Sequence, residues 1–295
     1  MNRRRKIDSR EIGLEIGLIL GKHLADTEHL HYGYWTDGLE VRFANLPRAQ
    51  EAYCHFLISH IPQDAKTILD VGCGSGRLAL MLSDRGCQVD CVSPSPLLAA
   101  RARDLLGERS HIFECSFEAL ETERRYDVVL FSESFQYVRL EKALENSLGF
   151  LNDRGHLLVC DFFKRDTEGQ SLIGGGHKLA RFRDLVAQHP FEAVEDIDIT
   201  QQTAPTLDVV NDLLVNAGVP IWSLCVRYLD GNYPLLYRSL CKFAQWKYKK
   251  KIDRFNRKYL SGARNAQTFA RLKSYRLLLY RKAGSGTAGQ SAERG

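Results

Sequence analysis

The stretch ILDVGCGSG, Ile68–Gly76, decides the fold, because an apolar strand runs directly into a turn with three glycines. Glycine has no Cβ and tolerates positive φ, so Gly72, Gly74 and Gly76 allow the backbone to approach a ligand closely. Asp70 comes just before this turn. In an open parallel sheet such a turn lies at the carboxyl ends of the strands, where ligands bind.

Short apolar runs alternate with helical patterns around this turn, which is typical of a parallel sheet covered on both faces. The expected strands are 67–71, 88–93, 111–115, 126–132, 155–163, 191–200 and 274–282. The clearest helical patterns cover 11–25, 46–61, 77–85, 96–106 and 139–151. The order predicts an α/β fold with a doubly wound, Rossmann-like, seven-stranded and mostly parallel sheet.

The same patterns predict four parts of the chain. Residues 1–62 form an N-terminal helical lid, and residues 63–206 with 273–283 form the core. Residues 207–272, helical and rich in aromatics, are expected as a cap inserted before the last strand. Residues 284–295 have the composition of a disordered tail.

The net charge of +5 is unevenly distributed along the chain. Residues 1–10 carry five Lys or Arg against one acid, and residues 242–282 carry fourteen against one, so the remaining body is acidic. The eight cysteines lack the paired CxxC spacing of zinc sites, which favours free thiols in a reducing cytosol. No run of eighteen consecutive apolar residues occurs. We therefore expect a cytoplasmic protein without a transmembrane helix.

The glycine turn does not fit a dinucleotide, because Gly76 comes one residue too early for GxGxxG. DVGCGSG, the following GC-x-V strand, YDVV and the GHLLV strand together resemble class I S-adenosylmethionine-dependent methyltransferases over residues 66–165. The turn HYGYW at 31–35 is similar to a segment of tocopherol methyltransferases and cyclopropane fatty-acid synthases. The resemblance implies S-adenosylmethionine as cofactor and a small-molecule or lipid-type acceptor.

The resemblance also implies roles for residues after the strands. Asp70 orients the glycine loop and the methionine ammonium, while Ser93 and Ser116 stand where the family commonly has acids. Their hydroxyls can still bond the ribose and the adenine, more weakly than a charged acceptor. Phe117 is expected to stack on the adenine, and Ser132 to contact the cofactor.

The aromatic turn has two interpretations. A sulfonium is a cation, and aromatic faces attract a desolvated cation by about 2 kcal/mol, so Tyr32, Tyr34 and Trp35 would close over the cofactor. Alternatively, these rings only pack the N-terminal helix onto the sheet.

Proton transfer from the acceptor needs a base near the strand ends. The candidates are Glu133, Asp161 and His177, of which we expect Glu133 and His177 to be catalytic. His177 follows three glycines, and its ordinary pKa suits proton transfer near neutral pH. We expect no metal site from His23, His29 and His31, whose spacing matches no known ligand set.

The acceptor is expected to be hydrophobic, of aromatic, polyketide or prenyl type, and methylated on oxygen or carbon. Gln136 stands where cyclopropane synthases have a carboxylate, which argues against cyclopropanation. Aromatic residues of the cap either line an acceptor chamber or form core: Trp222, Tyr228, Tyr233, Tyr237, Phe243 and Trp246.

Several interpretations of the partners stay open. The acceptor can be free or attached to a carrier protein, the basic arm can contact an anionic membrane, and the chain can form a homodimer. The alternatives to a small-molecule enzyme are an RNA methyltransferase that uses the basic arm and a non-catalytic binding protein with this fold.

Overall fold

The computed structural model describes residues 9–167 and 173–284, and one seven-stranded sheet forms the centre of this part. The strand order is β3-β2-β1-β4-β5-β7-β6. Strands β1 to β5 are parallel, and β7 is antiparallel to both β5 and β6. The bounds are β1 Thr67–Val71, β2 Gln88–Val92, β3 Ile112–Phe113, β4 Tyr126–Ser132, β5 Leu151–Lys164, β6 Phe191–Asp198 and β7 Lys273–Lys282. The predicted fold class is confirmed.

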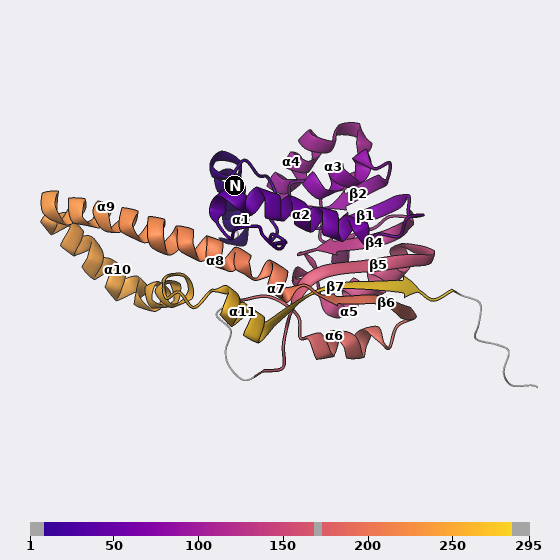
Figure 1. Cartoon of the computed structure of the whole chain (residues 1–295). Coiled ribbons are helices and arrows are strands. Elements are labelled where there is room, and N and C mark those ends of the chain that lie inside the picture. The colour runs from indigo at the N-terminus through magenta and orange to yellow at the C-terminus, as the bar shows by residue number, and fades with distance from the viewer. Residues whose placement is uncertain (1–8, 168–172, 285–295) are drawn as a thin grey trace, which may run out of the picture.

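Helices cover both faces of this sheet (Figure 1). Helices α2 (Leu46–Ser59), α3 (Arg77–Asp84) and α4 (Pro96–Leu106) pack on one face, where Tyr53 and Leu57 of α2 are fully buried. Helices α5 (Leu140–Phe150) and α6 (Leu179–Val186) pack on the other. Helix α2, which the sequence pattern places in the lid, therefore contributes to the core.

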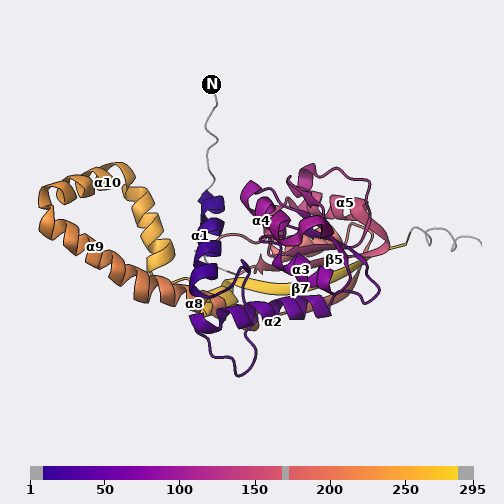
Figure 2. The same cartoon turned by 90° about the horizontal axis from the view of Figure 1, so that it is seen from above.

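Helix α1 (Ser9–Leu24) leads into a segment that runs back over the carboxyl ends of the strands (Figure 2). We call residues 25–35 the N-terminal strap. Ser75 Oγ of the glycine loop donates to the carbonyl of Glu28 at 2.7 Å, and Arg101 of α4 pairs with the carboxylate of Glu28. The strap therefore lies directly above the glycine loop.

The segment before β7 leaves the body of the protein. Helices α7 (Thr200–Thr203), α8 (Pro205–Asp212) and α11 (Ala266–Leu272) pack on the body, whereas α9 (Val219–Asn232) and α10 (Pro234–Phe255) have no buried residue. π-helical turns at 213–218 and 256–260 join them to α8 and α11. Figures 1 and 2 show α9 running outward from the sheet and α10 returning toward it along a separate path, and we call these two helices the helical hairpin.

The prediction that cap aromatics line a chamber or form core is wrong for the helical hairpin, because five of the six side chains are exposed and Tyr237 is half-buried. Trp222 is 67 % exposed and Trp246 81 %. By length and mean hydropathy alone, the continuous helix Thr200–Asn232 could cross a membrane: an 18-residue window in it averages 1.5, and 6 % of that window is buried. The count of consecutive apolar residues missed this helix, because polar residues interrupt it.

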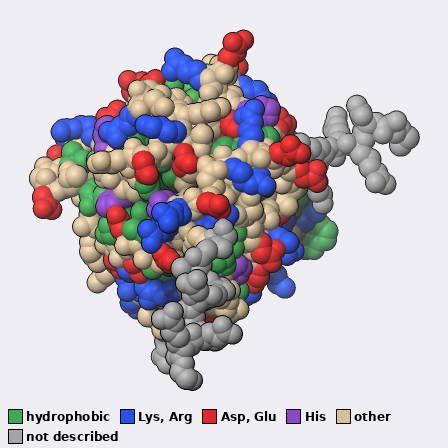
Figure 3. Space-filling model, turned by 90° about the vertical axis from the view of Figure 1, so that its right-hand side faces the viewer, with side chains coloured by type: hydrophobic (Ala, Val, Ile, Leu, Met, Phe, Trp, Pro, Cys, Tyr) green, Lys and Arg blue, Asp and Glu red, His purple; other side chains and the backbone are tan. Residues whose placement is uncertain are grey.

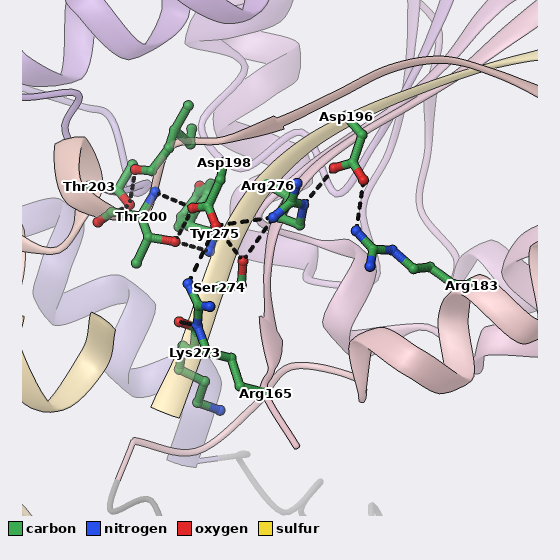
Figure 4. Close-up of polar contacts among 11 residues, drawn as sticks. Arg165, Arg183, Asp196, Asp198, Thr200, Thr203, Lys273, Ser274, Tyr275 and Arg276 are labelled. Atoms are coloured by element: carbon green, nitrogen blue, oxygen red, sulfur yellow. Dashed lines mark hydrogen bonds and ion pairs between the residues drawn. The ribbon is translucent and has the colours of Figure 1, made fainter. Parts of the chain in front are cut away.

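Strand β7 is fixed at its start by a polar network (Figure 4). Thr200 Oγ1 accepts the backbone N–H of Tyr275 at 2.8 Å, and Arg276 pairs with Asp196 at 2.5 Å and Asp198 at 3.0 Å. These contacts hold β7 and α7 in register. They thereby determine which side chains of β7 reach the carboxyl end of β4.

The face opposite the helical hairpin carries acidic and basic side chains that alternate over its surface (Figure 3). The predicted tail 284–295 begins on this side, and all of it beyond Gly284 lies outside the described residues. The basic residues of the first eight positions lie outside them as well.

Candidate active site

Three glycines form the loop between β1 and α3, all with positive φ: 77° at Gly72, 57° at Gly74 and 86° at Gly76. A Cβ on Gly72 would lie 2.4 Å from Ser134 Cβ, and one on Gly76 would lie 3.2 Å from Ala102. These two positions are restricted by the protein's own packing. Gly74 differs, since the nearest atom to its Cβ would be a methyl of Leu30 in the N-terminal strap, 3.8 Å away.

Asp70 lies at the end of β1 beneath this loop and is 1 % exposed. Its Oδ2 has no hydrogen-bond partner among the described residues. Burial raises the pKa of Asp70 to about 7. Because a buried polar atom without a partner is costly, this carboxylate fits a ligand that brings a donor, such as an ammonium group.

Ser93, Ser116 and Phe117 are the side chains expected around the ribose and adenine, and they differ in burial. Ser93 is buried at the end of β2, with its Oγ 3.4 Å from the carbonyl of Ser95, and Ser116 is half-buried. The expectation that Phe117 stacks on adenine is contradicted, because the ring is 2 % exposed and packs edge-on against Phe131 at 5.2 Å. Phe117 is a core residue.

The aromatic turn is divided between two roles. Tyr34 stacks on Phe56 of α2 with 4.8 Å between ring centroids, and buried Trp35 donates from Nε1 to Thr206 Oγ1 at 3.0 Å. Both rings attach the N-terminal strap to helices, so the expectation that they close over the cofactor is wrong. Tyr32 alone faces the strand ends, where its ring packs 6.0 Å from Tyr275.

Glu133 follows β4 in a left-handed conformation, with φ of 56°, which is uncommon for a residue other than glycine. Its Oε1 accepts the backbone N–H of Tyr32 at 2.6 Å and the hydroxyl of Tyr275 at 2.7 Å. Burial raises the pKa of Glu133 to about 8, with a smaller contribution from Asp161, although these hydrogen bonds lower it. A carboxyl with such a pKa can take up or release a proton near neutral pH.

A chain of hydroxyls continues from this carboxylate. The hydroxyl of Tyr275 lies 3.1 Å from that of Tyr53, and the Tyr53 hydroxyl lies 3.1 Å from Ser132 Oγ. The chain joins Glu133 to Ser132 at the end of β4 through side chains of α2 and β7. It holds the carboxylate in one position.

Asp161 lies one strand further along the same edge and is 1 % exposed. Its carboxylate accepts the backbone N–H of Gln136 at 3.0 Å and the Gln136 amide at 3.1 Å. Burial raises the pKa of Asp161 to about 7. Gln136, which the sequence comparison placed where other enzymes have an acid, thus positions a second buried carboxylate.

Lys273 is a buried charged residue near these carboxylates that the sequence analysis did not single out. It is fully buried at the start of β7, and its Nζ donates to the carbonyl of Gly175 at 2.6 Å and lies 5.2 Å from the centre of the Phe162 ring. Burial lowers the pKa of Lys273 to about 8, and Lys164 adds to this effect.

His177 is held through one nitrogen of its ring. Its Nε2 lies 3.2 Å from the carbonyl of Phe135 and 3.0 Å from that of Val138. Carbonyl oxygens only accept, so Nε2 carries the proton and the basic lone pair of the neutral ring lies on Nδ1. His177 therefore fastens the loop after β5 to the segment after β4.

Residues 45–202 match the sequence model of the methyltransferase domain family, which is more than half of the 295 residues. The chain belongs to this family. The matched segment contains the glycine loop, Asp70 and Glu133. The cofactor of this methyltransferase is S-adenosylmethionine. The glycine loop and the unpartnered oxygen of Asp70 fit the backbone and the ammonium of its methionine part.

Two curated relatives cover parts of the methyltransferase. An uncharacterized methyltransferase of Staphylococcus carnosus is 28 % identical over 158 residues, 50 % of this chain and 70 % of the relative. A malonyl-[acyl-carrier protein] O-methyltransferase of Anoxybacillus flavithermus is 30 % identical over 128 residues, 42 % of this chain and 48 % of the relative. The similarity thus spans about half the length of the second protein.

Solved structures resemble the methyltransferase over nearly its whole length. The [4+2]-cyclase SpnF has a TM-score of 0.65 at 17 % identity, covering 94 % of this chain and 98 % of its own. Geranyl diphosphate C-methyltransferase from Streptomyces coelicolor has a TM-score of 0.62 at 18 % identity, covering 95 % and 100 %. At such identities the likeness concerns the fold.

Proposed function

We propose that the methyltransferase transfers a methyl group from S-adenosylmethionine to an oxygen or carbon of a hydrophobic small molecule of aromatic, polyketide or prenyl type. The observation that carries this proposal is the buried Glu133 with a raised pKa, held at the carboxyl end of β4 by Tyr32 and Tyr275. The rings of Phe162 and Phe269 lie 6.1 and 5.8 Å from that of Tyr32. These rings place apolar surface beside Tyr32, which contacts Glu133 through its backbone N–H.

In this proposal the cofactor supplies an electrophilic methyl group. Asp70 holds the ammonium group of the cofactor, and the backbone at Gly74 supports its methionine part. Tyr32 is the aromatic candidate beside the sulfonium. The candidate contacts for the ribose and adenine are Ser93, Ser116 and Ser132. Ionised Glu133 takes the proton that the acceptor oxygen or carbon loses as its bond to the methyl carbon forms. The carbon–sulfur bond breaks at the same time. Alignment of the reactants can supply up to about 7–11 kcal/mol in ideal cases.

Two features support a hydrophobic acceptor that is delivered by a surface or a protein. The malonyl-[acyl-carrier protein] O-methyltransferases among the relatives act on a carrier-bound substrate by name. The helical hairpin exposes large apolar side chains, including Leu235 at 80 % and Trp246 at 81 %. Basic side chains follow on α10: Lys247, Lys249, Lys250, Lys251 and Arg254.

Of these two modes we favour an anionic membrane surface for the helical hairpin. Tryptophan and tyrosine are enriched at membrane–water interfaces, and each nearby Lys or Arg adds about 1 kcal/mol of attraction to anionic lipid. The helical hairpin carries exposed side chains of both kinds: apolar ones that can enter the membrane interface and basic ones that are attracted to anionic lipid. An acidic carrier protein would use the basic side chains and leave most of the apolar ones in water.

The function is tested by incubating the protein with methyl-labelled S-adenosylmethionine and extracts, then identifying labelled products by mass. Label in an extractable hydrophobic molecule supports the proposal. Label in bulk RNA would favour the RNA methyltransferase alternative, and the absence of turnover with every fraction would favour a non-catalytic binding protein.

Docking of the helical hairpin is tested separately by flotation with vesicles of phosphatidylcholine, with and without phosphatidylserine. We expect binding only with the anionic lipid, weakened by salt and by joint replacement of Lys249, Lys250 and Lys251 with Glu. Binding to an acidic carrier protein or self-association without vesicle binding would contradict the membrane proposal.

A further inference from the structure

Three potential metal ligands meet where the N-terminal strap crosses α2. His31 Nε2 lies 3.1 Å from His29 Nδ1 and 3.3 Å from Cys54 Sγ, and Cys54 Sγ lies 3.8 Å from His29 Nδ1. The two histidines are half-buried and Cys54 is fully buried. They form a cluster of facing donor atoms within the described residues.

The spacing of these atoms fits one tetrahedral ion. Zinc binds histidine nitrogen at about 2.0–2.1 Å and thiolate sulfur at about 2.3 Å, so two ligand atoms on one ion lie roughly 3.3–3.6 Å apart. The three observed distances, 3.1, 3.3 and 3.8 Å, scatter around that range. Imidazole and thiolate together are a donor set that zinc prefers.

The histidines are also prepared for binding. His31 Nδ1 lies 2.8 Å from the carbonyl of Tyr32, so Nδ1 carries the proton and Nε2 presents its lone pair to the cluster. Gln50, one helical turn before Cys54, donates from Nε2 to the carbonyls of His29 at 3.2 Å and His31 at 2.8 Å.

The surrounding charges partly balance a bound cation. Burial raises the pKa of the Cys54 thiol to about 12, and the Asp70 and Glu51 carboxylates add to this effect while Arg77 opposes it. Glu28 and Arg77 have opposite effects on the pKa of His29. These acids offset the positive charge that zinc would bring, while Arg77 opposes it.

We propose that His29, His31 and Cys54 bind one zinc ion that joins the N-terminal strap to α2. The site leaves a fourth position for water or another small ligand, as in sites with three protein ligands. His23, considered with these histidines from the sequence, is exposed on α1 and outside the cluster. Because two ligands belong to the strap and the third to the core, the ion would hold the strap over the glycine loop. This proposal is independent of the proposed function.

The test uses full-length protein freed of metal with a chelator and titrated with zinc sulfate. We expect one ion per chain and a higher unfolding midpoint with zinc. Cobalt in place of zinc should give the visible bands of a tetrahedral ion and a thiolate charge-transfer band. Cys54→Ser should abolish the charge-transfer band, and His31→Gln should weaken zinc binding by more than about tenfold.

Matched controls exclude binding elsewhere on the surface. Cys225→Ser and His23→Gln replace exposed residues of the same types and should bind zinc as the wild-type protein does. If Cys54→Ser does not fold, His29→Gln provides the second measurement of affinity. Absence of stoichiometric binding, or unchanged binding in the His31 and Cys54 variants, would overturn the proposal and leave a hydrogen-bonded cluster.

Discussion

Two glycines of one loop are restricted by different neighbours, and their substitution should have different effects. Gly72→Ala brings a methyl group against Ser134, whereas Gly74→Ala meets only Leu30 of the N-terminal strap. Both variants also carry the strain of positive φ, about 1–2 kcal/mol. We expect Gly72→Ala to lower the unfolding midpoint strongly, and Gly74→Ala to fold and lose cofactor affinity. Chemical denaturation and calorimetry with S-adenosylmethionine measure the two effects; equal effects of both would contradict the assignment.

The proton transfer assigned to Glu133 can be tested at the same scale. Glu133→Gln should lower kcat by roughly 10²- to 10⁴-fold, the usual contribution of a positioned base, with cofactor affinity nearly unchanged. Because ionised Glu133 is the active form and its pKa is about 8, the wild-type rate should rise with pH up to about 8. Glu121→Gln, at an exposed position, serves as control. A variant with full activity would exclude Glu133 as the base.

Asp70 links cofactor binding to the pH dependence of stability. Its folded-state pKa of about 7 lies above the unfolded value near 4, so the folded protein holds its proton more tightly. Its favourable contribution is complete below pH 4 and is lost as pH rises to about 7, by an amount on the order of a few kcal/mol. Asp70→Asn should flatten the dependence of the unfolding free energy between pH 5 and 8, and weaken cofactor binding. Denaturant titrations at several pH values test this.

The position of a single residue could be predicted from the sequence where that residue lies at the end of a clearly patterned strand. The positions of Asp70 and Glu133 follow from the strands that precede them, and both lie at the shared edge of the sheet. Phe117 was assigned wrongly, because the direction of a side chain after a loop depends on packing that a sequence pattern does not contain. Phe117 points into the core, and His177 toward two carbonyls.

Among the elements, β7 depends most on contacts that are distant in sequence. Thr200 is 2 % exposed and its hydroxyl both accepts the Tyr275 N–H and donates to Asp198. Thr200→Val keeps the shape and removes these bonds, so the free energy of unfolding should fall by about 1–3 kcal/mol. Thr36→Val, at an exposed position, is the control. A loss no larger than that of the control would show that the network does not fix β7.

Most elements could be located from the sequence because their periodicity was clear. Strands β1 and β4 and helix α4 begin and end where the pattern predicts. The helical content of 207–272 was also predictable, whereas its exposure was not. Periodicity identifies an apolar helix face without identifying what covers it.

At the scale of the whole molecule, residues 9–167 and 173–284 form a folded body and a helical hairpin whose helices α9 and α10 have no buried residue. The turns at either end of the hairpin contact each other, and Asp208 accepts the Ala266 N–H at 2.8 Å. Replacing 219–255 with a short Gly/Ser linker should therefore leave the unfolding midpoint within a few degrees of wild type. The same variant should lose vesicle binding. Unfolding or aggregation of this variant would show that the hairpin contributes to the stability of the body.

The order of the strands in the sheet has a consequence for synthesis. Strand β7 is last in the chain, yet it lies between β5 and β6 and carries Lys273 and Tyr275. Until it emerges from the ribosome, both neighbouring strands present unpaired edges, which favour association with other chains. A ribosome that pauses within α9 or α10 therefore holds a nascent chain with an open sheet and an incomplete proton-transfer site. Such chains are expected to depend on chaperones.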